Sequence, residues 1–150
     1  MSMRAPVARA LSLVSIVVLI GLASACGNDS PSSPTANVTS NTVTFSTQIQ
    51  QQILNPACTA CHTDEGRTPA SGLNLRSGVS HSQLVGVASV GKAGAIRVIA
   101  GNPSGSYLIQ KLEGASDIVG LRMPRNGPPF LTDAQVALIR QWIQNGAPNN

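Results

Sequence analysis

Two of the three cysteines and one of the two histidines stand together in the stretch Cys58-Thr59-Ala60-Cys61-His62. Three kinds of chemistry use such a grouping. Two thiols separated by two residues reach the two vinyl groups on one edge of a porphyrin, and the next histidine is then carried beneath the iron as an axial ligand. The same residues also supply half of a zinc site, or a redox disulfide that happens to precede a histidine.

The zinc alternative needs four ligands, and the chain offers Cys58, Cys61, His62 and His81 for them. The count suffices, but a histidine directly beside Cys61 is poorly placed to close a tetrahedron. A thioredoxin-like redox site requires strands and βαβ units around the cysteines, and no such pattern is visible. Random placement of this composition produces Cys-x-x-Cys-His in roughly one chain in a thousand, so covalent haem attachment is the favoured interpretation.

Residues 1–25 have the pattern of an export signal. Arg4 and Arg9 form a positively charged start, residues 11–23 form an apolar run, and Ala23-Ser24-Ala25 forms a small-residue cleavage site. The apolar run is short for a membrane span, although an uncleaved anchor helix is the alternative. Export strengthens the haem interpretation, because c-type haem is attached outside the cytoplasm.

The cleavage site also resembles a bacterial lipoprotein signal, in which the cysteine after the small residues is lipidated. The usual leucine lies three positions before that cysteine; here Ala23 holds this position and Leu22 lies one earlier. This departure leaves ordinary cleavage after Ala25 as the alternative. Lipidation would give Cys26 a function. Without it, an exported protein would carry an odd, exposed thiol. Residues 26–43 are rich in Ser, Thr, Asn and Pro and predict a disordered linker that holds the domain off the membrane.

Charge excludes one class of partner. Two of the ten basic residues, Arg4 and Arg9, lie in the signal segment, so the rest of the chain carries eight basic and six acidic residues and a net charge near +2. This excess is too small and too dispersed to indicate nucleic-acid binding.

Outside residues 1–25, Met123 is the only methionine, and it lies 61 residues after His62. A thioether is a soft ligand that stabilises ferrous iron and raises the reduction potential. The prolines at 124, 128 and 129 are expected to restrain its loop. We therefore predict Met123 as the sixth iron ligand, with two alternatives: Met123 as core filler, or His81 as a second histidine ligand that gives a lower potential.

Four helices are expected, joined by long loops. The first spans 46–55, with Phe45, Ile49 and Ile53 on one face, and ends at Asn55-Pro56 because the residue before proline leaves the helical region. A short helix follows at 81–87, within loops over 63–101. The third spans 103–112, with Asn102 as cap and Pro103 at its first position.

The last helix has the most complete signals. Thr132 and Gln135 form a capping box, Leu131 and Val136 have the spacing of a hydrophobic staple, and Gly146 and Pro148 end the helix. Its inward stripe is formed by Val136, Ile139 and Ile143, flanked by Leu138 and Trp142. A domain near 100 residues with so few aromatic residues has little apolar surface to bury, and a large apolar cofactor would supply what is missing.

The segment 44–148 resembles single-haem c-type cytochrome domains of the small helical cytochrome c class, of the exported bacterial lipoprotein type. The resemblance rests on Cys58-Thr-Ala-Cys61-His62, on the closing segment RMPRNGPPFLTDAQVALIRQWIQNGAPN, and on Gly101-Asn-Pro-Ser-Gly-Ser-Tyr-Leu. It implies an all-α fold, with three to five short helices around one covalently bound haem c. It also implies Cys58 and Cys61 as thioether residues and His62 and Met123 as axial ligands.

The resemblance further implies that the first helix packs against the last. Many members have a glycine and an aromatic residue in the first helix where this chain has Gln50 and Leu54. We therefore expect a contact that differs in detail. It should be formed by Ile49, Ile53, Leu54, Ile139 and Trp142.

The predicted function is one-electron transfer in the cell envelope by a monomeric, non-enzymatic haem protein. It would be anchored through lipid at Cys26 in the periplasm or at the outer membrane, and it would exchange electrons with other redox proteins. Two alternatives remain: a haem sensor or peroxidase-like protein whose Met123 is displaced, and a haem-free binding lipoprotein stapled by Cys58 and Cys61.

Overall fold

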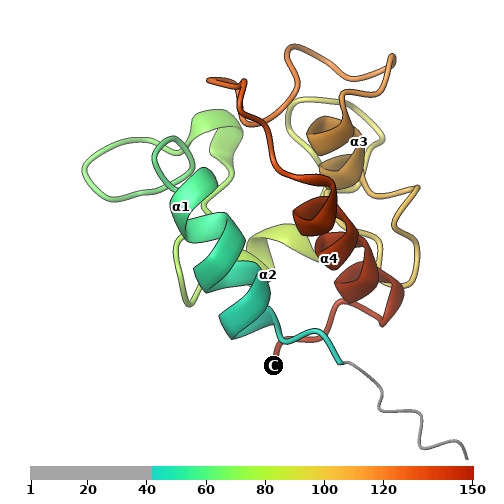
Figure 1. Cartoon of the computed structure of the whole chain (residues 1–150). Helices are drawn as coiled ribbons and strands as arrows, with labels where there is room; N and C mark the ends of the chain where they lie inside the picture. The colour runs from blue at the N-terminus through green and yellow to red at the C-terminus, as the bar shows by residue number, and fades with distance from the viewer. Residues whose placement is uncertain (1–41) are drawn as a thin grey trace, which may run out of the picture. The chain divides into compact units, whose positions relative to one another are not determined.

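A computed structural model describes residues 42–150 of the chain. The signal peptide predicted over 1–25, the lipidation site Cys26 and the linker up to residue 41 lie outside the described residues. Within 42–150 every regular element is helical and no strand forms, so this part of the chain is all-α (Figure 1). Extended segments meet only at isolated bridges, such as Val85 with Val98. No helix in this range has the length and apolar character needed to cross a membrane.

The first helix is a π-helix, η1, over Phe45–Leu54, and it continues directly into the short helix α1 over Asn55–Ala57. Figure 1 draws the two as one continuous ribbon. Hydrogen bonds close over five residues rather than four, as from the Asn55 N–H to the Gln50 carbonyl. The predicted face is confirmed, because Phe45, Ile49 and Ile53 are all buried.

The predicted end of this helix at Asn55-Pro56 is wrong. Asn55 keeps helical dihedrals, with φ −59° and ψ −53°, and the helix runs through Pro56. A proline inside a helix lacks one N–H and its ring crowds the preceding turn. Here Pro56 is exposed, as are Gln51 and Gln52 one turn earlier, so the proline lies on the outer face of the helix.

Two short elements follow. The 3-10 turn η2 spans Ala70–Gly72, and the helix α2 spans Ser80–Leu84. The expected short helix at 81–87 therefore exists but begins one residue earlier and ends three residues earlier. It ends because Val85 turns to an extended conformation, in which it forms the bridge to Val98.

Helix α3 spans Tyr107–Glu113, so its predicted start at Pro103 is wrong. Asn102 caps a turn instead of a helix: its side-chain oxygen accepts from the Gly105 N–H, and its carbonyl accepts from the Ser106 hydroxyl. Ser106 is extended, with φ −81° and ψ 120°, which prevents a helix from passing through it. The helix ends at Gly114, whose φ of 73° is the left-handed cap that glycine favours.

Helix α4 spans Asp133–Gln144 and confirms the strongest local prediction. The Gln135 N–H donates to the Thr132 hydroxyl at 3.2 Å, and the Gln135 side chain accepts from the Thr132 N–H at 2.9 Å, which completes the capping box. Leu131 and Val136 are both buried, as the staple requires.

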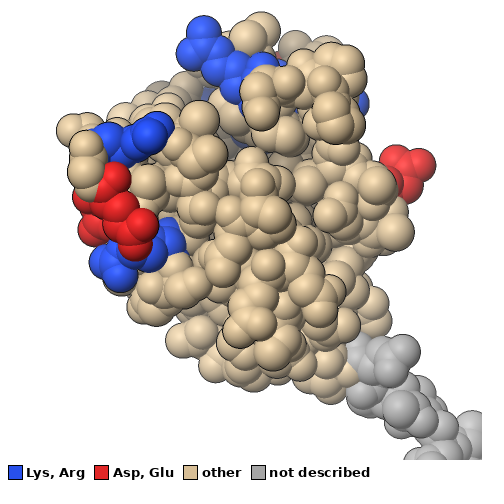
Figure 2. All heavy atoms as spheres, turned by 60° about the vertical axis from the view of Figure 1, so that its left-hand side comes forward, with Lys and Arg blue, Asp and Glu red and all other residues tan. Residues whose placement is uncertain are grey.

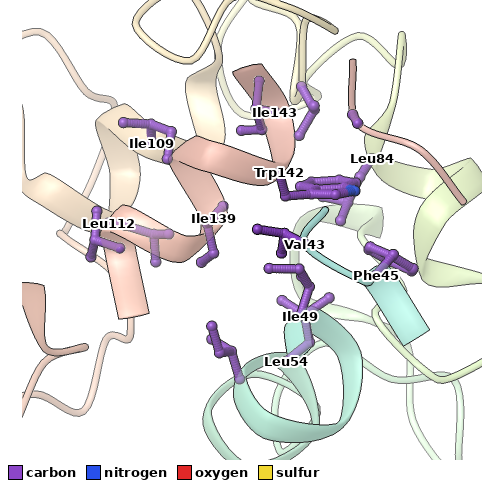
Figure 3. Packing of buried hydrophobic residues seen from close by; sticks show 14 of the residues in the cluster. Val43, Phe45, Ile49, Leu54, Leu84, Ile109, Leu112, Ile139, Trp142 and Ile143 are labelled. Atoms are coloured by element: carbon purple, nitrogen blue, oxygen red, sulfur yellow. The ribbon is translucent and has the colours of Figure 1, made fainter. Parts of the chain in front are cut away.

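The core lies where η1 packs against α4, which confirms the predicted contact between the first and last helices. Figure 3 shows apolar side chains of both helices turned toward one another. Trp142 is fully buried, with its ring 5.0 Å from that of Phe45. The hydrophobic cluster includes all five predicted contact residues, Ile49, Ile53, Leu54, Ile139 and Trp142. It extends to Val43, the last residue of the predicted linker.

Gln50 is a buried polar residue in this apolar interface, with 4% of its surface exposed. Its amide nitrogen donates to the Asn55 side chain at 2.7 Å and to the Leu75 carbonyl at 2.9 Å. Its amide oxygen accepts from the hydroxyl of Ser80, which is also buried. Gln50 thereby ties η1 to α2 and to the loop before it.

Gln50→Ala is expected to lower the free energy of unfolding by about 1–3 kcal/mol, because it leaves the Leu75 carbonyl and the Ser80 hydroxyl buried without a partner. Denaturant unfolding followed by circular dichroism measures this loss. Gln51→Ala is the matched control, because Gln51 is exposed on the same helix; it should stay within about 0.5 kcal/mol of the natural protein. Equal stabilities for the two variants would contradict the role of Gln50.

Helices α3 and α4 are joined by a two-pronged ion pair, in which the Arg140 guanidinium donates to the Glu113 carboxylate at 2.8 and 2.7 Å. The hydrogen bond from Arg140 holds the pKa of Glu113 below its ordinary value of 4.5. Both side chains are more than a third exposed, so solvent limits the strength of the pair.

Glu113→Gln is expected to destabilise the protein at neutral pH by less than about 1 kcal/mol. Because the folded-state pKa of Glu113 is depressed, its contribution is present above about pH 4.5 and is lost as the pH falls through the lower, folded-state value. Thermal unfolding of both proteins across this range should therefore show the difference shrinking on acidification. A difference that grows with acid would contradict the assignment.

Candidate functional site

The Cys58-x-x-Cys61-His62 stretch forms a tight turn directly after helix α1. The N–H groups of Cys61 and His62 both donate to the Cys58 carbonyl, at 3.1 and 3.0 Å. The Cys58 N–H in turn donates to the Leu54 carbonyl at 2.9 Å, so the turn is a continuation of the first helix. The structure thus brings the three predicted residues into one short turn whose orientation the core-packed helix determines.

The two thiols lie in different surroundings. Cys61 is exposed, whereas Cys58 is half-buried and packs against the hydrophobic cluster. Burial raises the pKa of the Cys58 thiol to about 11, so this thiol stays protonated at neutral pH. No disulfide joins the two residues.

His62 is held by one ring nitrogen. Its Nδ1 lies 3.0 Å from the Ala70 carbonyl oxygen and 3.3 Å from that of Leu73. Because carbonyls only accept, Nδ1 carries the proton, and Nε2 is left unprotonated in the neutral ring. Burial lowers the pKa of His62; the two carbonyls oppose this effect, and the positive charge of Arg97 adds to it.

The carbonyls that hold His62 come from the segment 70–73, which contains η2. Ser71 has a φ of 53°, a left-handed conformation that is uncommon for residues other than glycine. The Ala70 N–H donates back to the Cys61 carbonyl at 3.0 Å, and the Leu75 N–H donates to the His62 carbonyl at 2.8 Å. The segment therefore braces both the backbone and the ring of His62.

Arg97 is bound to the same segment and is the residue that sequence reasoning missed. It is 7% exposed, and it donates to the Gln83 carbonyl at 2.8 Å and to the Gly72 carbonyl at 3.3 Å. Sequence alone offers no signal for it, because an arginine in a loop normally reads as a solvated charge.

Met123 lies half-buried against the hydrophobic cluster, on the loop between α3 and α4. Its N–H donates to the Lys111 carbonyl in α3 at 2.8 Å. In the residues just before Met123, the Val119 N–H donates to the Tyr107 hydroxyl at 3.0 Å, and the Arg122 side chain donates to the Leu112 carbonyl at 2.7 Å. The predicted restraint on the Met123 loop therefore comes from hydrogen bonds to α3, in addition to prolines in the sequence.

A chain of hydrogen bonds connects His62 to Met123. The segment 70–73 binds the His62 ring and the Arg97 side chain. The Arg97 carbonyl accepts from the Leu108 N–H at 2.9 Å, in the first turn of α3. Helix α3 then holds the N–H of Met123 through the carbonyl of Lys111. The two predicted ligands, far apart in sequence, are thus supported by one hydrogen-bonded framework.

His81 lies in a different environment. Its Nε2 is 2.8 Å from the Ala147 carbonyl oxygen, and its ring packs edge-on against Phe45, with the centroids 5.1 Å apart. The His81 ring also contacts Trp142, with the two ring centroids 6.1 Å apart. His81 therefore joins α2 to η1 and to the end of the chain, and its Nε2 is already engaged by a carbonyl.

The zinc alternative requires Cys58, Cys61, His62 and His81 to meet. Across residues 42–150, no group of three or more His, Cys, Asp or Glu side chains is arranged to hold a metal ion by itself. His81 is engaged at Ala147, so the four ligands are not assembled.

The donor set fits a haem c. An iron-binding histidine commonly donates its second ring N–H to a carbonyl, which fixes the ring and leaves the other nitrogen for the metal. His62 has this arrangement. Cys58 and Met123 both belong to the group of half-buried apolar residues at the edge of the cluster, which also includes Leu73 and Leu108. Incompletely covered apolar side chains of this kind are what a large apolar cofactor would cover.

Two hollows on the protein surface lie away from this turn. The larger, of about 460 Å³, is lined by charged residues of α3, α4 and the loop between them, together with Val136 and Ala137. The smaller, of about 180 Å³, lies between the start of η1 and α4. Neither is lined by Cys58, Cys61 or His62.

Comparison of the chain with protein-family models, with curated proteins and with solved structures finds no match.

Differential alkylation tests the surroundings of the two thiols. In haem-free protein at mildly alkaline pH, Cys61 should be alkylated at least about tenfold faster than Cys58, because the thiolate is the nucleophile and Cys58 is half-buried with a pKa of about 11. Peptide mass mapping over a time course measures both rates. Unfolding in denaturant should abolish the difference, and equal rates in the folded protein would contradict the described burial.

Proposed function

We propose that the protein is a monohaem c-type cytochrome that carries single electrons in the cell envelope. The observation that carries the proposal is the His62 ring, whose Nδ1 is bound by the Ala70 and Leu73 carbonyls beside two free thiols at the required spacing. When bound, haem c supplies an iron centre that changes its charge by one electron. Cys58 and Cys61 would hold it covalently.

Each residue then has a defined task. The carbonyls of Ala70 and Leu73 orient the His62 ring, so that Nε2 is presented as a neutral ligand before iron is bound. Helix α3 holds the backbone of Met123 through Lys111. Ligands held in place in advance need little rearrangement when the charge of the site changes. This rigidity suits electron transfer more than substrate turnover.

The same anchoring favours a carrier over the alternative of a sensor or peroxidase-like protein. Displacement of Met123 would require its loop to move, yet Lys111 donates from its ammonium group to the carbonyls of Val119 and Leu121. The Arg122 guanidinium also stacks over the Phe130 ring at 4.2 Å. A sixth ligand on such a loop is expected to stay bound in both oxidation states. The haem-free binding lipoprotein remains the alternative if no haem is attached.

The proposal includes other redox proteins as partners and a lipid anchor at Cys26. Figure 2 shows the side of the molecule on the left in Figure 1, where a broad uncharged surface is bordered by small groups of charged side chains. A surface of this kind suits brief contacts with partners, since strong fields of one sign are missing from it.

Covalent haem is the first test. Protein produced in cells with a haem-attachment system should keep its haem after denaturation, and Cys58→Ala with Cys61→Ala should abolish this. The measurement is haem-dependent staining of the denatured protein together with its intact mass. An unmodified mass for the natural chain would refute the proposal.

Met123→Ala tests the sixth ligand. The variant should keep covalent haem, but its reduction potential should fall by on the order of 0.1 V. Axial ligands set haem potentials over a range of about 0.8 V. The reduced variant should also bind carbon monoxide. His81→Ala is the control and should change neither property, because His81 is engaged at Ala147. The reverse pattern would make His81 the ligand.

A further inference from the structure

Arg97 carries a buried positive charge that no carboxylate of residues 42–150 pairs with. Only 7% of its surface is exposed, and both hydrogen bonds of its guanidinium go to backbone carbonyls, those of Gln83 and Gly72. Among the ion pairs of residues 42–150, none involves Arg97. Its guanidinium therefore donates to two carbonyls and forms no ion pair within this part of the chain.

Such an arrangement is costly. An arginine stays protonated in proteins, so burial does not neutralise it. Buried charges are normally paired, because desolvation of an unpaired ion costs several kcal/mol. Structural roles for a side chain at this position, such as bridging two carbonyls, do not need a full charge. The uncompensated charge therefore points to a role in electrostatics.

The position of the charge indicates what it acts on. Gly72, which accepts from Arg97, lies between Ala70 and Leu73, which hold the His62 ring. The guanidinium and the imidazole are thus fixed by carbonyls of one four-residue segment. Charges in a partly buried site are screened much less than charges in water.

We propose that Arg97 sets the reduction potential of the iron centre at His62 by placing a buried positive charge on the segment that holds this histidine. The inference rests on the proposed function. One electron from a donor redox protein lowers the charge of the centre by one, and no bond forms or breaks. A neighbouring positive charge favours the state of lower charge, so Arg97 raises the potential.

Arg97→Gln in the haem-loaded full chain removes this charge and keeps hydrogen-bond donors. The potential should fall by an amount that changes the reduction equilibrium about tenfold, or 59 mV for one electron. Arg97→Lys keeps the charge and should stay closer to the natural protein. Arg140→Gln is the matched control, because Arg140 is more exposed and paired with Glu113, and it should change the equilibrium less than about threefold.

Redox titration followed by the visible spectrum gives the potential, and unchanged spectra in both states show that the axial ligands are retained. Gln83→Glu provides a second route if Arg97→Gln does not fold. It adds a negative charge at the residue whose carbonyl accepts from Arg97 and should lower the potential in the same direction.

The outcomes separate the two proposals. Haem that is covalently attached, with a lower potential in Arg97→Gln, supports both. Attached haem with a shift no larger than that of Arg140→Gln, or with an equal shift in Arg97→Lys, overturns the role of Arg97 alone. An unchanged potential in Gln83→Glu, where it is the variant that folds, also overturns it. Absence of attached haem in the natural chain overturns the proposed function first.

Discussion

The segment 70–73 contributes three backbone carbonyls to two side chains, and the candidate site depends on this arrangement. Ala70 and Leu73 bind the ring of His62, and Gly72 binds the guanidinium of Arg97. Backbone carbonyls normally pair with backbone N–H groups. Here the Ala70 carbonyl also accepts from the Leu73 N–H at 3.2 Å, so the short turn η2 is kept while carbonyls of the segment bind side chains. The left-handed Ser71 is where the chain departs from a helical path to do so.

The rest of the domain positions this segment rather than contributing to it directly. Helices η1 and α4 form the packed centre, with Trp142 buried against Phe45 and His81. Gln50 extends this centre to Leu75 and Ser80, on either side of the loop that follows the segment. Helix α3 receives the Arg97 carbonyl at its first turn and gives its own carbonyls to the Met123 loop. A small apolar core thus positions a larger, polar framework.

Features encoded by neighbouring residues were predictable from sequence, and features created by tertiary contacts were not. The capping box at Thr132 fixed the start of α4 correctly, because both partners lie within one turn. The predicted start of α3 was wrong because the Ser106 hydroxyl donates to the Asn102 carbonyl and accepts from the Ile99 N–H. Local sequence patterns do not encode these contacts. The predicted end of the first helix was wrong because the helix packs with Pro56 on its exposed face, and the local sequence does not encode which face is exposed. Arg97 and Gln50 are polar in sequence, and only the fold shows that they are buried.

The two ends of the described chain are hydrogen-bonded to each other. The Ser46 N–H donates to the Asn150 carbonyl at 2.8 Å, and the Phe45 N–H donates to the Asn150 side chain at 2.7 Å. Figure 1 shows the C-terminus beside the start of the first helix. Tension applied to the chain at residue 42 therefore meets these bonds at the first two residues of η1, before it can pass along the helix. The turn that carries Cys58 and His62, at the far end of this helix, is therefore shielded from strain that enters at residue 42.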